Sequence, residues 1–286
     1  MPTVLTRLSG GALLAAATLV GASLVCVAPA QAAVAAALRV VPVAAAAPAV
    51  PVAAAAWGPP AICHPIEIGE ARSLPWNAAE AFGTRADYDL KDVVDDTRAI
   101  LRGTPDALVH METVRRAVIY LTGIGGRAHS DVDEAWRARE IARLVDALKA
   151  DIVDAQLDDG ADAEAGRRVA LAWFDAGYAL CALNQAGRHV QGLGPEADVT
   201  TGLVMVGKAA TLLPQDGTVQ LGASIAHFGE GRPDRACYAH LDRALQAVDD
   251  PDGLLRRNVL ATMGGFLGAK DHDELARKVR AALERT

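Results

Sequence analysis

Chemically capable side chains gather in one short stretch that follows an Ala- and Pro-rich N-terminal region. Cys63, His64, Glu67 and Glu70 place a thiol, an imidazole and two carboxylates within eight residues. These are the groups that nucleophilic and general acid–base catalysis need. Neighbouring side chains of an extended segment point to opposite faces, so His64 is badly placed to deprotonate Cys63. Catalysis at these four residues is therefore one hypothesis, and a structural role for the stretch is the other.

The same stretch also carries apolar side chains that suit the structural role. Residues 61–86 contain several Pro and Gly residues and no helical period, so we expect an ordered but irregular opening segment. Its apolar residues would pack onto a helical core: Ile62, Ile66, Ile68, Leu74 and Trp76. The segment resembles the opening of a family of uncharacterised secreted bacterial proteins, and this resemblance implies no particular activity.

The remaining polar motifs predict neither a metal site nor a cofactor site. The acidic loops at 158–160 and 249–253 fail as EF-hand loops, because Ala155 or Val248 would stand at the first ligand position. The glycines of 123–126 follow an expected helix rather than a strand, which indicates a helix end and not a phosphate loop. No two of the seven histidines are spaced as an i, i+4 ligand pair; they lie at positions 64, 110, 129, 189, 227, 240 and 272. We therefore expect no cofactor and no metal.

The cysteines indicate at least one free thiol. Of the four cysteines, Cys63, Cys181 and Cys237 remain after removal of a signal peptide, and an odd number cannot be fully paired within one chain. A bridge between Cys181 and Cys237 across neighbouring helices is one arrangement. The other is that Cys181, which lies in an apolar helical run, is simply a small buried side chain.

The N-terminus has the three-part layout of a secretory signal peptide. Arg7 precedes an apolar stretch over 10–27, and Ala30 and Ala32 supply the small residues of a cleavage site. We expect a signal peptide at 1–32, a disordered Ala/Pro/Val-rich tether at 33–60 and no membrane span after cleavage. An uncleaved membrane anchor is the alternative. Export would place the protein in the periplasm, the cell envelope or the medium.

Charge and composition exclude several classes of partner and fold. The formal net charge of −7 becomes −9 after residue 56, because that part holds all 35 acidic and 26 of the 28 basic residues. A long acidic chain without a basic cluster is a poor partner for nucleic acid. Aromatic residues make up only 4% of the chain while alanine is abundant. This combination disfavours a β-sandwich or barrel and favours packed helices.

Apolar periodicity predicts a helical domain over 61–286. The spacing indicates helices over residues 90–101, 108–121, 136–152 and 162–185. In the last third, two further pairs of helices are expected to turn at proline-containing sequences. The first pair is 201–213 with a helix that begins at 219, and the second is 241–248 with 254–267. Pro214 and Pro251 stand 37 residues apart at corresponding turns, a period typical of helix–turn–helix repeats.

One of these turns carries a family resemblance. Residues 208–216 resemble the helix-end signature of tetratricopeptide repeats, although Gly222 falls two positions early for that pattern. The resemblance covers about residues 198–286. It implies stacked antiparallel helical hairpins, as in an α-solenoid, and the binding of a peptide or protein.

These observations lead to two hypotheses about function. We expect an exported, all-α protein whose hairpins form a tetratricopeptide-like solenoid and serve as an interaction scaffold. The alternative is a secreted enzyme whose site forms where the opening segment covers the helices. A scaffold should show an open surface lined by polar and aromatic side chains, whereas an enzyme should show a closed pocket with converging titratable groups. The sequence leaves open whether the helices form a solenoid or a compact bundle.

Overall fold

A computed structural model of the chain describes residues 58–77, 82–125, 129–158, 162–187, 198–229, 232–250 and 252–285. The chain divides into two units, Met1–Val50 and Pro51–Thr286, and every described residue belongs to the second. The predicted signal peptide at 1–32 and all of the predicted tether up to residue 57 lie outside the described residues. Pro60, the last residue of that tether, is buried and begins a helix, so the folded part extends back to about residue 58.

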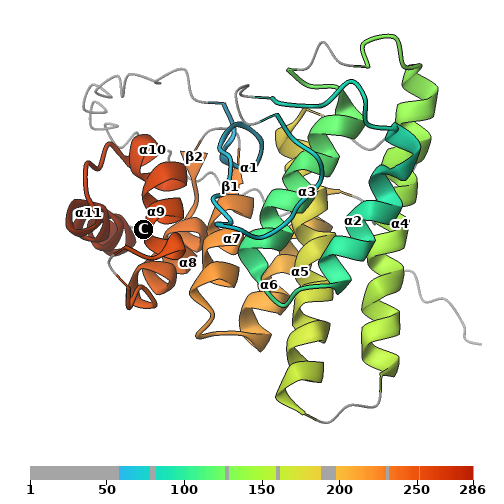
Figure 1. Cartoon of the computed structure of the whole chain (residues 1–286). Helices are drawn as coiled ribbons and strands as arrows, with labels where there is room; N and C mark the ends of the chain where they lie inside the picture. The colour runs from blue at the N-terminus through green and yellow to red at the C-terminus, as the bar shows by residue number, and fades with distance from the viewer. Residues whose placement is uncertain are drawn as a thin grey trace, which may run out of the picture. The chain divides into compact units, whose positions relative to one another are not determined.

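Helices make up nearly all of the regular structure in the described residues, so the prediction of an all-α fold is confirmed (Figure 1). The main helices are α2 (Val93–Arg102), α3 (Ala107–Thr122), α4 (Glu134–Leu157), α5 (Ala163–Gln185), α6 (Val199–Leu212), α7 (Gly217–Ala226), α8 (Arg235–Gln246), α9 (Leu254–Val259) and α11 (His272–Arg285). Short elements are α1 (Pro60–Cys63), α10 (Gly265–Leu267), a 3₁₀ turn at Leu90–Asp92 and a π-helical turn at Leu260–Gly264. A two-residue antiparallel pair, β1 (Phe228–Gly229) and β2 (Arg232–Pro233), joins α7 to α8.

Aspartate side chains start the helices from α3 to α8. Each accepts a hydrogen bond from a backbone N–H of the first helical turn, which satisfies a donor that the helix itself leaves unpaired. The capping residues are Asp106, Asp133, Asp162, Asp198, Asp216 and Asp234. At the other end of α3, Gly123 adopts a left-handed φ of 68°, as expected of a helix-ending glycine. Part of the acidic composition therefore serves to cap helix N-termini.

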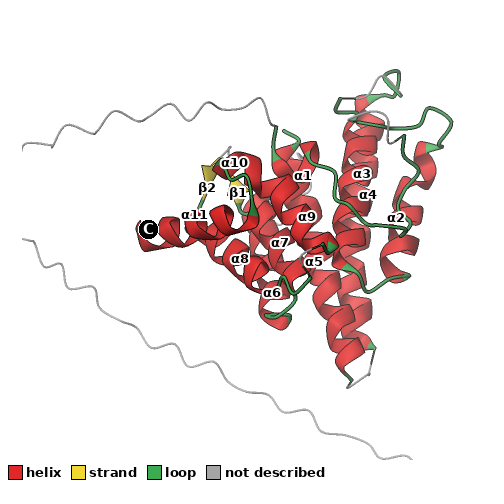
Figure 2. Ribbon diagram, turned by 60° about the vertical axis from the view of Figure 1, so that its left-hand side comes forward, coloured by secondary structure: helices red, strands yellow, loops and turns green. Residues whose placement is uncertain are grey.

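Helix α5 is the central element of the packing. It contacts α4 and α6, its neighbours in sequence, and also α3 and α7 (Figures 1 and 2). Its side chains Phe174 and Tyr178 are fully buried and stack on each other, with their ring centroids 5.4 Å apart. Farther along the chain, α8 contacts both α7 and α11. Hairpins of consecutive helices thus share a core in which α3, α5 and α7 meet.

Glycines allow α5 and α6 to pack closely. A Cβ atom on Gly177 of α5 would lie 2.7 Å from both the carbonyl oxygen of Gly202 and the backbone nitrogen of Val206 on α6. A Cβ on Gly202 would in turn lie 3.0 Å from the carbonyl oxygen of Gly177. Only glycine fits at this crossing, because the obstructing atoms belong to backbone that cannot rotate away.

The C-terminal third differs from its expected form at one place. Helix α6 ends at Leu212 and α7 begins at Gly217, so the chain turns around Pro214. A turn also separates α8 from α9, although Pro251 itself lies outside the described residues. The expected helix over 254–267 is instead divided by the π-helical turn at Leu260–Gly264. The two adjacent glycines, Gly264 and Gly265, weaken regular helix there and favour the wider turn. None of the described helices has the length and apolar character needed to cross a membrane.

Candidate functional site

The opening segment is held to α3 by a buried ion pair. Both side chains of the pair, Glu112 and Arg115, are almost completely buried, and their closest atoms, Oε2 and Nε, lie 2.7 Å apart. The backbone N–H of Ile66 donates to Glu112 Oε2 at 3.0 Å, and Arg115 Nη1 donates to the carbonyl oxygen of Ile62 at 3.0 Å. Burial alone would raise the pKa of Glu112, but the hydrogen bonds and charge of Arg115 outweigh it and lower that pKa. The segment is thus bonded through its backbone to a charged pair in the core.

A second set of contacts holds the later part of the opening segment. Arg116 Nη1 donates to the carbonyl oxygen of Leu74 at 2.6 Å, and the Tyr120 hydroxyl donates to that of Pro75 at 2.6 Å. The Trp76 ring covers the Arg116 guanidinium, with 5.4 Å from Cζ to the ring centroid. Figure 2 shows this segment as a loop lying across the helices. The contacts match the structural role considered for the segment.

The two most reactive of the predicted site residues have different neighbours. Cys63 ends α1, and its sulfur occupies the place where a Cβ on Gly58 would stand. Burial raises the pKa of the Cys63 thiol, which disfavours the thiolate that a nucleophile requires. The His64 ring packs on Phe266, with centroids 5.3 Å apart, and burial lowers the pKa of His64.

The two glutamates of the predicted site lie at the surface. The Glu67 carboxylate pairs with Arg257, with 2.7 Å between Oε2 and Nε, while the Glu67 backbone bonds to Asn258. Glu70 is exposed. Neither of the two pockets described below is lined by Cys63, His64, Glu67 or Glu70.

All three cysteines in the described part of the chain are free thiols. Cys181 is buried on α5, where its sulfur would lie 3.0 Å from a Cβ on Gly202. Cys237 is buried on α8, 3.4 Å from the Ser224 hydroxyl oxygen. Burial raises the pKa of both thiols to about 12. The bridge between Cys181 and Cys237 is therefore absent, and each is a small buried side chain.

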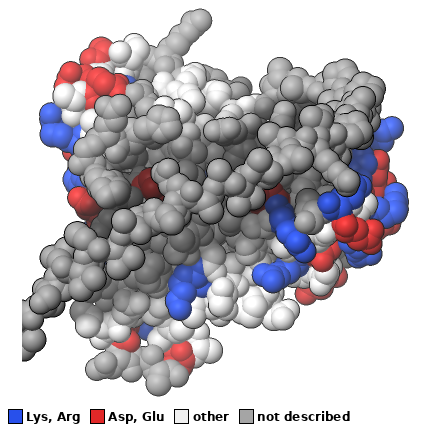
Figure 3. Space-filling model, turned by 180° about the vertical axis from the view of Figure 1, so that it is seen from behind, with Lys and Arg blue, Asp and Glu red and all other residues white. Residues whose placement is uncertain are grey.

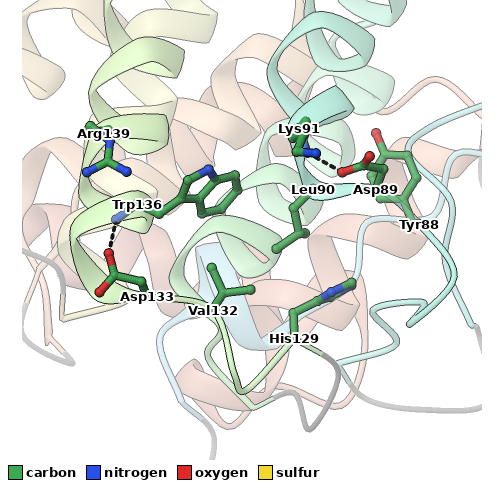
Figure 4. Close-up of a pocket in the computed structure, with 9 residues that line it drawn as sticks. All are labelled: Tyr88, Asp89, Leu90, Lys91, His129, Val132, Asp133, Trp136 and Arg139. Carbon is green, nitrogen blue, oxygen red and sulfur yellow. Dashed lines mark hydrogen bonds between the residues drawn. The ribbon is translucent and has the colours of Figure 1, made fainter.

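A groove of about 500 Å³ lies where the start of α2 approaches the start of α4. Its lining residues, all shown in Figure 4, are Tyr88, Asp89, Leu90, Lys91, His129, Val132, Asp133, Trp136 and Arg139. Leu90 is buried at its base, while Val132 and the Trp136 ring are half-buried beside it. The groove thus offers an apolar floor that is partly open to solvent, between charged residues at its edge.

Local hydrogen bonds fix the walls of this groove. Asp133 caps α4 by accepting a hydrogen bond from the Trp136 N–H at 3.0 Å, which places the indole at the first turn. Asp89 accepts a hydrogen bond from the Lys91 N–H at 3.0 Å in the same manner. His129 adopts a φ of 62°, unusual for a residue with a side chain, and its Nε2 donates to the carbonyl oxygen of Arg85 at 3.0 Å. These hydrogen bonds hold the walls of the groove in a defined conformation.

The groove continues inward as an aromatic cluster centred on Tyr120. The Tyr120 ring centroid lies 5.1 Å from that of Tyr88, 6.3 Å from that of His129 and 6.1 Å from that of Trp76. Four of the eight Trp and Tyr residues of the chain, Trp76, Tyr88, Tyr120 and Trp136, are therefore at or directly behind this groove. Because aromatic residues are scarce in this chain, their positions were the one sequence signal that could have indicated the groove.

The other pocket, of about 570 Å³, lies between the α2–α3 loop and helices α4 and α5. Among its lining residues are His110 of α3 and Asp175 of α5, which form a buried pair. Neither residue stands in a recognisable motif, because the pairing joins two helices far apart in sequence. Among the described residues, no group of three or more His, Cys, Asp or Glu side chains is arranged to hold a metal ion.

Comparison of the chain with protein-family models, with curated protein sequences and with solved structures gave no match.

Proposed function

We propose that the chain is an exported protein-interaction module that binds a peptide segment of a partner protein in the groove of Figure 4. The observation that carries the proposal is the half-buried Trp136 ring on an open apolar floor. Partly exposed tryptophan and tyrosine side chains contribute strongly to protein interfaces, because each buries a large area with few rotatable bonds. Open geometry with aromatic lining is what distinguishes a scaffold from an enzyme pocket.

The charges at the groove edge indicate which peptide it would take. The carboxylates of Asp89 and Asp133 each accept one backbone N–H group through a single oxygen. Within the described residues, the Lys91 ammonium and the Arg139 guanidinium have no hydrogen-bond or ion-pair partner. Figure 4 shows these two cations on either side of the Trp136 ring. An apolar or aromatic side chain flanked by Asp or Glu would meet both features.

The sequence and the helical packing support the wider setting of this proposal. Export rests on Arg7 and the Ala30–Ala32 cleavage site, and the scaffold role on the hairpins that resemble tetratricopeptide repeats. The net charge of −7 argues against nucleic acid as the partner. On the face shown in Figure 3, basic and acidic side chains are interspersed over the described surface. The raised pKa of the Cys63 thiol favours the module over the alternative of an enzyme built on the opening segment.

A selection from a random peptide library tests the groove. Peptides captured by the full chain should contain an aromatic or large aliphatic residue next to Asp or Glu. We expect Trp136→Ala to weaken their binding by at least about tenfold, as removal of a central aromatic contact does. The double variant Lys91→Glu/Arg139→Glu should weaken it as well. Val204→Ala is the matched control, because Val204 is an apolar side chain on α6, 68% exposed and outside the groove. Peptides that bind Trp136→Ala as well as the unaltered chain would overturn the proposal.

Export has a separate test. N-terminal sequencing of the protein recovered from its native host should begin at Ala33, after cleavage following Ala32. An intact Met1 in the cytosolic fraction would contradict export without affecting the groove.

A further inference from the structure

The pocket between α4 and α5 has an apolar wall and a charged floor. Leu101, Leu171 and Ala172 contribute apolar surface, and Ala155 lines the side that α4 forms. At the floor, His110 and Asp175 are both buried, with 3% and 8% of their side-chain surface exposed. A cavity of about 570 Å³ with one buried polar pair is typical of a small-molecule site.

The hydrogen bonds of His110 indicate which of its ring nitrogens carry a hydrogen. His110 Nδ1 lies 2.8 Å from Asp175 Oδ1, and its Nε2 lies 2.9 Å from the carbonyl oxygen of Thr104. A carbonyl oxygen can only accept, so Nε2 carries a hydrogen. Burial alone would lower the pKa of His110, but the adjacent Asp175 carboxylate outweighs it and raises that pKa. The raised pKa of His110 favours an imidazolium that donates from both nitrogens, while burial raises the pKa of Asp175 and the charge of His110 opposes that rise.

Asp175 keeps one oxygen free. Its Oδ1 is bonded to His110, whereas its Oδ2 has no hydrogen-bond partner in the described part of the chain. Oδ2 is not enclosed by protein atoms, because it reaches the surface of the pocket. Because Asp175 lines the pocket, this oxygen is available to a donor that enters the pocket.

The cations around the pocket are already engaged. Arg102 bonds to Asp151, and Arg168 pairs with Asp158 at 2.7 Å. The third arginine of the pocket, Arg167, is held in the same way. It pairs with Asp216 at 2.6 Å and donates to the carbonyl oxygen of Pro105. An anionic ligand would have to break these pairs, whereas a cation needs only the Asp175 oxygen that the pairs leave open.

We propose that this pocket binds a small organic molecule through a protonated primary amine, which donates a hydrogen bond to Asp175 Oδ2. The hydrocarbon part of the ligand lies along Leu101 and Leu171. His110 is a positioning residue that holds the Asp175 carboxylate through its Nδ1. This site is independent of the peptide groove and requires no metal.

Calorimetric titration of the full chain with n-butylammonium chloride tests the proposal. We expect saturable binding in the millimolar range, as suits a ligand of so few atoms. The matched probe 1-butanol has the same hydrocarbon chain without the charge, and it should bind at least about tenfold more weakly. Asp175→Asn should reduce butylammonium binding by at least about tenfold, whereas Asp146→Asn, an exposed residue of α4 outside the pocket, should leave it unchanged. Tighter binding of butyrate, or equal binding of butanol, would overturn the proposal.

A second variant and a spectroscopic measurement remain informative if Asp175→Asn does not fold. Ala155→Leu narrows the pocket without touching the charged pair, and we expect it to weaken binding of butylammonium. The bound cation should also lower the pKa of His110, measured by NMR, because a second positive charge then shares the Asp175 carboxylate. An unchanged His110 titration at saturating butylammonium would show that the amine binds elsewhere, and the proposal would fail.

Discussion

The side-chain amide of Asn258 forms two hydrogen bonds with the backbone of Glu67, a residue 191 positions earlier in the chain. Asn258 Oδ1 accepts from the Glu67 N–H at 2.7 Å, and Asn258 Nδ2 donates to the Glu67 carbonyl oxygen at 2.8 Å. The Asn258 side chain is fully buried on α9. The opening segment is therefore bonded to α9 as well as to α3. These contacts join the first described part of the chain to its C-terminal third.

Asn258→Ala should lower the free energy of unfolding by about 1–3 kcal/mol, because it leaves the N–H and the carbonyl oxygen of Glu67 without their side-chain partners. Urea denaturation followed by circular dichroism measures the change. The neighbouring variant Arg257→Ala loses an exposed ion pair with Glu67 and an exposed hydrogen bond to the carbonyl oxygen of Asp252, so its cost should stay below about 1 kcal/mol. Equal effects of the two substitutions would show that the amide bridge is not the stronger contact.

Glu112→Gln should cost about 3–5 kcal/mol, since it leaves the buried Arg115 guanidinium without its counter-charge. The lowered pKa of Glu112 also predicts acid sensitivity. A carboxylate with a depressed pKa contributes stability above its unfolded pKa, about 4.3, and this stability is lost as the pH falls through the folded pKa. The free energy of unfolding should fall between neutral and acidic pH in the unaltered chain. It should fall less over the same range in Glu112→Gln. A pH profile that Glu112→Gln leaves unchanged would contradict the assignment.

The pKa values of His110 and the half-buried His240 should be shifted in opposite directions. The pKa of His110 is raised by Asp175, so its contribution to stability is complete below the unfolded value, about 6.5, and is lost as the pH rises through the folded pKa. Burial and the neighbouring His227 lower the pKa of His240 to about 4. NMR titration of the ring resonances separates the two, with His110→Gln assigning the first signal. A His110 resonance that titrates below the ordinary histidine range would contradict the charged state inferred for the pair.

Gly177→Ala should destabilise the protein by about 1–3 kcal/mol, because the added methyl group would press on the backbone of α6. Gly166 offers a control on the same helix, since a Cβ there meets no atom within 4 Å. Gly166→Ala should instead stabilise the helix by up to about 1 kcal/mol through its higher helix propensity. Thermal unfolding of both variants measures the difference. A similar response to both substitutions would show that the close approach of α5 and α6 is not rigid.

Local signals in the sequence were enough to predict the helices. Apolar spacing, on which these predictions were based, acts within one or two helical turns, so it can be recognised without knowledge of the fold. Gly123 was recognised as a helix end for the same reason. The division of the helix expected over 254–267 was missed, because the choice between α- and π-helical turns also depends on how the segment packs.

The candidate sites were decided by tertiary structure. Cys63, His64, Glu67 and Glu70 are neighbours in sequence, yet their side chains have different surroundings. Trp136 meets Leu90 in one groove, and His110 meets Asp175 from 65 positions away. Spacing along a chain determines which face of its own helix a side chain occupies. Which other helix covers that face depends on the packing of the whole core, including close approaches such as that of Gly177 to Gly202, and no local pattern encodes it.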